Sequence, residues 1–179
     1  MKKPWVLVVA TVFATISTLA FVRSQGGETS SPSQTDPRAQ PIAFPHDTHA
    51  GDFQIDCEYC HFSAERSVDA GIPPVASCMG CHTVIQGRNA PEEVNKLRGF
   101  WQRGETIPWV RIYKVADHVK FPHMRHVALD AGNFTCQECH GPVEEMAVIE
   151  DVEFPLKMGW CVTCHRENDA SVDCTVCHY

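Results

Sequence analysis

Long apolar runs are scarce in this sequence, and the one that stands out lies at the N-terminus. The 179 residues include 12 prolines and 11 glycines, a composition that argues against an ordinary core packed from side chains alone. Residues 44–179 are long enough to enclose one core by size. Something other than side chains must therefore fill much of the interior.

Excess positive charge is also lacking. The formal net charge is −7, which is unfavourable for binding nucleic acid, so we expect no nucleic-acid partner. The charge is uneven: residues 88–125 hold eight Lys/Arg and four Asp/Glu, whereas residues 138–173 hold nine Asp/Glu and two Lys/Arg. An ordinary solvated surface and a docking face at the acidic C-terminal end remain alternative interpretations.

The N-terminal apolar run lacks charge from Trp5 to Val22, and Lys2 and Lys3 precede it. Its eighteen residues meet the minimum for a membrane-spanning helix. No clear A-x-A cleavage site follows, and the lysines favour a cytoplasmic N-terminus. We therefore predict a transmembrane anchor over 1–23, with a cleaved signal peptide as the alternative. The Ser/Gln/Gly/Pro-rich stretch 24–43 is a predicted flexible linker, and 44–179 is the predicted domain, exported to the periplasmic side.

No cysteine lies outside a C-x-x-C-H motif. The five motifs are Cys57-Cys60-His61, Cys78-Cys81-His82, Cys136-Cys139-His140, Cys161-Cys164-His165 and Cys174-Cys177-His178. This spacing is typical of c-type haem attachment, in which two thioethers fix the porphyrin and the adjacent histidine is the proximal iron ligand. The sequence predicts five covalently bound haem c groups, which would also supply the missing core.

Other roles for these cysteines do not fit their number and spacing. Structural zinc would pair C-x-x-C units into four-ligand sites, and five units do not pair evenly. A thioredoxin-like redox site would need one motif near a βαβ pattern rather than five. A disulfide framework would not cluster the cysteines in this way.

Five histidines remain outside the motifs, one for each predicted haem: His46, His49, His118, His123 and His126. Four of them belong to an internal repeat, because 44–61 and 121–140 both run F-P-H-x-x-H, then a short loop, then C-x-x-C-H. Imidazole suits iron as an axial ligand, so these four are predicted distal ligands. Met158 competes with His118 for the fifth position.

The remaining segments give a coarse view of the fold. Residues 91–104 read as a short amphipathic helix, and 106–115 as a strand or an extended segment. The predicted fold class is a multihaem cytochrome c, mostly irregular, with short α-helices around a haem core. Two axial ligands from the chain for each iron leave no open position for a substrate, so the sequence predicts no catalytic residue and an electron-transfer role rather than an enzyme.

The F-P-H-x-x-H segment before C-x-x-C-H resembles the class III multihaem cytochromes, such as cytochromes c3 and c7. In those proteins the first histidine of the pair binds the haem of the next C-x-x-C-H motif, and the second binds another haem. The resemblance implies that His46 binds the haem on Cys57 and Cys60. It also implies that His123 binds the haem on Cys136 and Cys139, and that His49 and His126 bind neighbouring haems.

A narrower resemblance covers nearly the whole chain. The apolar run, the polar linker, the five motifs and three further segments are similar to the pentahaem subunit of alternative complex III. These segments are W-x-x-G-x-x-I-P-W-V-R-I (101–112), D-H-V-x-F-x-H-x-x-H-V (117–127) and M-G-W-C-x-x-C-H-R (158–166). In that family the position matching His118 is not dependably His, so the resemblance favours Met158 as the fifth distal ligand, which would give one haem of higher potential.

That resemblance implies a role in a membrane complex that oxidises quinol. The implied partners are an iron–sulfur subunit, integral membrane subunits and a monohaem cytochrome, with a soluble carrier or an oxidase downstream. A stand-alone, membrane-anchored quinol-oxidising cytochrome is one alternative, although the apolar run shows no polar group to receive a quinol proton. A multihaem reductase and a freely diffusing periplasmic shuttle are the others. The reductase would need an open iron, and no C-x-x-C-K is present.

Overall fold

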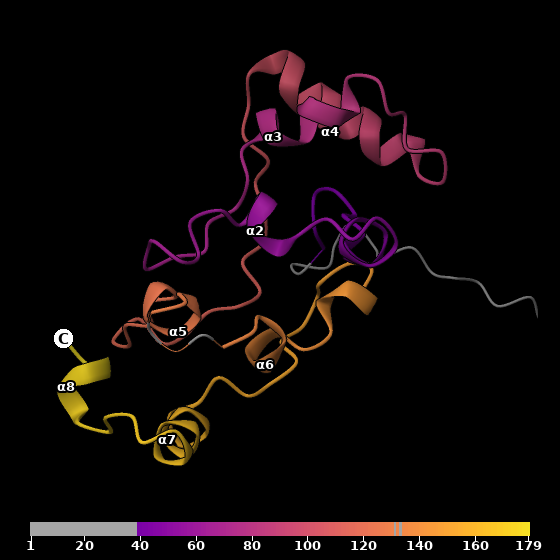
Figure 1. The fold of residues 1–179 in the computed structure, drawn as a ribbon. Helices are drawn as coiled ribbons and strands as arrows, with labels where there is room; N and C mark the ends of the chain where they lie inside the picture. Colours follow the sequence, from indigo (N-terminus) through magenta and orange to yellow (C-terminus); the bar gives the residue numbers. More distant parts are fainter. Residues whose placement is uncertain (1–38, 131, 133) are drawn as a thin grey trace, which may run out of the picture. The chain divides into compact units, whose positions relative to one another are not determined.

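The computed structural model describes residues 39–130, 132 and 134–179. This part of the chain consists of short helices joined by irregular segments, and none of its residues forms a β-strand (Figure 1). In chain order the helices are η1 (Asp47–Asp52), α2 (Cys57–Cys60), α3 (Val75–His82), α4 (Pro91–Arg103), α5 (Met124–Val127), α6 (Gln137–His140), η2 (Val143–Glu145), α7 (Met158–Glu167) and α8 (Cys174–Cys177). The prediction of short helices in a mostly irregular chain is confirmed.

Helix α4 confirms the helix predicted over 91–104. It begins at Pro91, whose fixed φ suits the first turn, and Glu92 and Glu93 follow in that turn. It ends before Gly104, which adopts φ 66° and donates its backbone N–H to the carbonyls of Phe100 and Trp101. Glycine takes this left-handed conformation without a Cβ clash, so the helix stops there.

The apolar core of the described residues is small. Helix α4 buries Val94 and Leu97, and α3 lies beside it (Figure 1). Leu97 packs in one cluster with Ile42, Met79 and Ile107. This cluster joins α3 and α4 to Ile42 and Ile107. Among the described residues, the chain around the other C-x-x-C-H motifs therefore has no side-chain core of its own.

Two residues that precede Phe44 pack against the rest of the described chain. Ile42 belongs to the core cluster, and the Gln40 amide exchanges two hydrogen bonds with the backbone of Val110, at 2.9 and 3.0 Å. Gln40 and Ile42 both fall inside the predicted linker 24–43. The segment 106–115 runs without regular structure, so of its two predicted forms the strand is wrong.

The predicted anchor, residues 1–23, and most of the predicted linker lie outside the described residues. Within 39–130, 132 and 134–179, no helix has the length and apolar character required to span a membrane.

Candidate haem-binding sites

Each C-x-x-C-H motif lies in or beside a helical turn, and we number them site 1 to site 5 in chain order. Site 1 lies on α2, site 2 on α3, site 3 on α6, site 4 on α7 and site 5 on α8. Two of the three four-residue helices at these sites, α2 and α8, are capped by aspartate. Asp56 accepts a hydrogen bond from the N–H of Glu58 before site 1, and Asp173 accepts one from the N–H of Thr175 before site 5, both at 2.8 Å. Such caps stabilise turns too short to persist alone.

A second histidine lies near every proximal histidine. The separations of the ring centres are 6.2 Å for His49–His82, 6.5 Å for His123–His140, 6.0 Å for His126–His165 and 5.4 Å for His118–His178. At site 1, His46 lies within electrostatic range of His61. The five histidines outside the motifs are thus distributed one to each site.

The separations fit a metal ion held between the two rings. Metal–imidazole bonds in proteins are about 2.0 to 2.1 Å long, so two imidazoles on opposite faces of one metal ion have ring centres roughly 6 Å apart. The four ring pairs span 5.4 to 6.5 Å. A haem iron takes its other ligands from the porphyrin, so two imidazoles per site are what it requires from the chain.

The sequence repeat is also a repeat in three dimensions. Phe44 stacks on His49 with ring centres 4.4 Å apart and meets His46 edge-on at 4.8 Å. Phe121 stacks on His126 at 4.2 Å and meets His123 edge-on at 5.0 Å. The F-P-H-x-x-H signal contained both phenylalanines, but the motif alone did not show that they hold the two imidazoles of each module in place.

Backbone carbonyls fix the orientation of most of these imidazoles. In seven histidines the ring Nδ1 is hydrogen-bonded to a carbonyl oxygen: His61 to Gly71, His82 to Ile85, His165 to Ser171, His178 to His118, His49 to Pro45, His123 to Val68 and His126 to Pro122, over 2.6 to 3.1 Å. When Nδ1 carries the proton, Nε2 has the free lone pair that binds a metal. The chain therefore presents Nε2 at the sites.

Burial keeps several of the rings in the neutral form that ligates metal. Desolvation, followed by the nearby His123 and His61, lowers the pKa of His140 to about 4. Desolvation is also the main reason that the pKa values of His46 and His126 lie below the ordinary value for histidine. These three imidazoles are uncharged at neutral pH.

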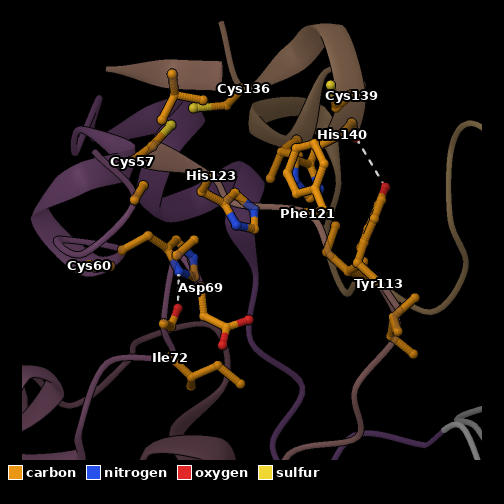
Figure 2. A pocket seen from close by; sticks show the side chains of 18 of the residues that line it. Cys57, Cys60, Asp69, Ile72, Tyr113, Phe121, His123, Cys136, Cys139 and His140 are labelled. Carbon is orange, nitrogen blue, oxygen red and sulfur yellow. Dashed lines mark hydrogen bonds between the residues drawn. The ribbon is translucent and has the colours of Figure 1, made fainter. Parts of the chain in front are cut away.

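One cavity of about 2800 Å³ runs past all five sites. All ten cysteines, all five proximal histidines and all the candidate distal ligands line it, namely His46, His49, His118, His123, His126 and Met158. A site for one small ligand is typically ~300 to 1,000 Å³, so this cavity has room for several large cofactors. Figure 2 shows the part at site 3, where the side chains of His123, His140 and Phe121 lie close together, with Cys136 and Cys139 above them in this view.

Met158 and His118 occupy different places. Met158 begins α7, three residues before Cys161 of site 4, and its side chain is 73% exposed. At site 4 the proximal His165 already has His126 beside it. His118 lies at site 5, where its ring is nearly parallel to that of His178, at an interplanar angle of 16°.

Tyr113 is a contact residue of site 3 that sequence reasoning missed. Its ring lies 4.3 Å from that of His140, and its hydroxyl donates to the His140 carbonyl at 3.3 Å (Figure 2). The same hydroxyl accepts the backbone N–H of Glu153 at 3.1 Å. No local sequence pattern indicates this role, because the three residues are far apart along the chain.

The zinc alternative finds no support at these sites. Across the described ranges, no group of three or more His, Cys, Asp and Glu side chains comes together to hold a metal ion directly. The arrangement is one of imidazole pairs beside cysteine pairs.

Comparison with known proteins agrees with this geometry. Residues 24–107 match the class III cytochrome c family, and residues 119–179 match the family of cytochrome c7 and related cytochromes c. A menaquinone reductase multihaem cytochrome c subunit from Nitratidesulfovibrio vulgaris is 30% identical over 168 residues, covering 79% of this chain and 77% of the relative. The paired imidazoles, the C-x-x-C-H motifs and these matches together show that the chain belongs to the multihaem c-type cytochromes, electron-transfer proteins with covalently bound haem c.

Proposed function

We propose that this protein is an electron conduit with five haem c groups, each held by two cysteines and two histidines. The observation that carries the proposal is the distribution of ten histidines into five pairs, one at each C-x-x-C-H motif. The proposed pairs are His61 with His46, His82 with His49, His140 with His123, His165 with His126, and His178 with His118.

The fifth pair contains His118 rather than Met158. The ring of His118 lies 5.4 Å from that of His178, whereas Met158 lies on α7 beside a site that already has two imidazoles. With His118 as the ligand, all five sites have the bis-histidine ligation that gives a low potential compared with Met/His ligation. The high-potential haem implied by Met158 is then absent.

The side chains of the sites bind and orient rather than react. Bound haem supplies one-electron redox chemistry. The two imidazoles of each pair would hold the iron between them, which would leave no position for a substrate. Carbonyl oxygens hold the Nδ1 atoms, and Phe44 and Phe121 hold the ring planes. Such fixed ligation favours electron passage over catalysis.

We further propose that the chain works in a membrane complex that exchanges electrons with quinone. Residues 1–23 anchor it, and the domain lies on the periplasmic side. Its partners are an iron–sulfur subunit, integral membrane subunits and a monohaem cytochrome, as in alternative complex III, with a soluble carrier or an oxidase beyond them. Support comes from the motifs at 101–112, 117–127 and 158–166, and from the relative that is a subunit of a menaquinone reductase.

Two directions of electron flow are open to such a conduit. The resemblance to alternative complex III favours electrons leaving quinol for a downstream acceptor. The name of the relative favours electrons entering menaquinone. Sites with two histidine ligands for each iron can pass electrons in either direction. The potentials of the haems relative to the quinone couple therefore decide the direction of electron flow.

The complex can be tested in native membranes. The chain should migrate in mild detergent within a larger complex that reacts with quinone or quinol, because it has no substrate site of its own. The purified single chain should accept electrons from dithionite but turn over negligibly with quinol. Robust quinol oxidation by the single chain would contradict the proposal and favour a stand-alone quinol dehydrogenase.

The direction of electron flow can be measured in the same complex. If quinol oxidation is the function, added quinol should reduce the haems rapidly. Electrons should then pass to an added oxidised cytochrome or oxidase. If menaquinone reduction is the function, haems reduced beforehand should be reoxidised by a menaquinone analogue, and quinol should reduce few of them.

A further inference from the structure

The order of the five sites in space follows from contacts between them. It rests on the proposed ligand pairs, because a haem can be placed only where its two histidines are known. The sequence alone gives the order along the chain, which need not be the order that electrons follow.

Sites 1 and 2 are neighbours. His46 and His49 are three residues apart at the start of η1, and they face His61 of site 1 and His82 of site 2. Residues at this spacing on a helical turn lie about 5 to 6 Å apart. The cysteines agree, because the Cys60 thiol of site 1 lies within electrostatic range of Cys81 and Cys78 of site 2.

Sites 3 and 4 are neighbours in the same way. His123 and His126 are three residues apart, and they face His140 of site 3 and His165 of site 4. The Cys139 thiol of site 3 lies within electrostatic range of Cys164 and Cys161 of site 4. Sites 1 and 2 therefore form one adjacent pair, which we call the first module. Sites 3 and 4 form another, which we call the second module.

The modules meet through sites 1 and 3. Figure 2 shows the side chains of Cys57 and Cys136 pointing toward one another, and Cys57 lies within electrostatic range of Cys136. His61 lies within electrostatic range of His140. Site 1, and not site 2, therefore borders the second module.

The backbone joins the modules at the same place. Helix η1 packs against η2, which follows site 3. The N–H groups of His46 and Asp47 donate to the carbonyls of Ala147 and Met146, at 2.9 and 2.7 Å. The His123 N–H donates to the carbonyl of Val68, in the segment after site 1, at 2.9 Å.

Site 5 adjoins site 4. The Cys161 thiol of site 4 lies within electrostatic range of Cys177 of site 5. Only eight residues separate His165 from Cys174. The four neighbour relations, 1 with 2, 1 with 3, 3 with 4 and 4 with 5, form one unbranched series.

We infer that the haem-binding sites follow one another in space as 2–1–3–4–5. The second and fifth motifs of the sequence are then the two ends at which electrons enter and leave, and the first motif is internal. One end adjoins α4, through α3, and the other is the C-terminal segment with the exposed acidic side chains of Glu167, Asp169 and Asp173.

The positions of the irons in the full-length holoprotein test this order. Iron-edge anomalous diffraction locates the irons, and each iron is assigned to a site through the cysteines that bind its porphyrin. The iron of site 1 should lie between the irons of sites 2 and 3. An iron at Cys78 and Cys81 that lies between the first and third irons would overturn the order, as would a branched arrangement.

A matched pair of variants gives a second test in solution. Replacing a distal histidine by methionine raises the potential of that haem. His49→Met should raise the potential of the haem at Cys78 and Cys81 and shift the titration of one neighbour. His46→Met should raise the potential of the haem at Cys57 and Cys60 and shift two neighbours. Redox titration followed by NMR of the haem methyl groups resolves the shifts.

The possible failures are distinguishable. The reverse pattern, with two neighbours shifted by His49→Met and one by His46→Met, overturns the order while the ligand pairs stand. A variant that still carries five haems by mass but changes no potential overturns its ligand pair and the order with it. Neither result depends on whether the protein acts in a quinone-linked complex.

Discussion

At the scale of residues, the proposed ligation of a fifth haem depends on His118. Its imidazole lies nearly parallel to that of His178, with ring centres 5.4 Å apart. Its own carbonyl accepts the Nδ1 proton of His178 at 3.0 Å. His118 therefore both faces the proximal imidazole and fixes its orientation.

We expect His118→Phe to remove one axial ligand and to leave one haem of five high-spin or bound by a different ligand. The phenyl ring keeps the bulk and planarity of the side chain but has no nitrogen to bind iron. Electron paramagnetic resonance of the oxidised holoprotein measures the change. Met158→Leu is the matched control and should leave all five haems low-spin, because the site beside Met158 already has the imidazoles of His126 and His165. The opposite outcome would restore Met158 as the fifth ligand.

The residue scale also shows what the sequence could predict of the site. The motif spacing predicted ten cysteines and five proximal histidines as haem-binding residues, and the count of spare histidines predicted the distal candidates. The role of His118 as a distal ligand could not be predicted from the sequence, because its neighbour His178 is sixty residues away and no local pattern joins them. Tyr113 was missed for the same reason.

At the scale of elements, α4 is the longest helix of the described residues and one that the sequence predicted closely. Its signals are local: Pro91 at the first turn, acidic residues after it, and Gly104 at the end. The four-residue helices at sites 1, 3 and 5 give no such periodic signal. The π-helical turn η1 after His46 had none either, since it depends on backbone contacts with Met146 and Ala147.

We expect Gly104→Ala to lower the free energy of unfolding by about 1 to 2 kcal/mol, the cost of a left-handed conformation for a residue with a Cβ. No atom lies within 4 Å of the added Cβ, so the backbone conformation alone accounts for the loss. Denaturant unfolding of the holoprotein measures it.

Gly99→Ala is the matched control in the same helix. Its added Cβ meets only the flexible end of Arg103, and alanine has a helix propensity about 1 kcal/mol better than glycine. This variant should be neutral or slightly stabilising. An equal loss in both variants would show that the left-handed cap is not the cause.

At the scale of the whole molecule, the cofactors replace the core that the composition lacks. Few apolar side chains are buried in the part of the chain that the structure describes, and their one cluster there lies around α3 and α4. Most of the described residues instead border the cavity that passes all five sites. The sequence indicated that the interior needed another filling, but not the 2–1–3–4–5 order, which depends on contacts between distant segments.

We expect the intact, denatured full-length chain to carry five haem masses, because each C-x-x-C-H motif fixes one haem through two thioethers. Mass spectrometry gives the count. Replacing Cys174 and Cys177 by alanine should reduce it to four. Four or fewer haems on the unaltered chain would remove at least one of the proposed sites.

The most direct measurement is near-infrared magnetic circular dichroism of the oxidised, native full-length protein, because it distinguishes the axial ligands of each low-spin iron. Five bis-histidine sites predict bis-imidazole charge-transfer bands alone, with an intensity equal to five haems per chain. A sulfur–iron band or a substantial high-spin signal would contradict the proposal that all five haems have two histidine ligands.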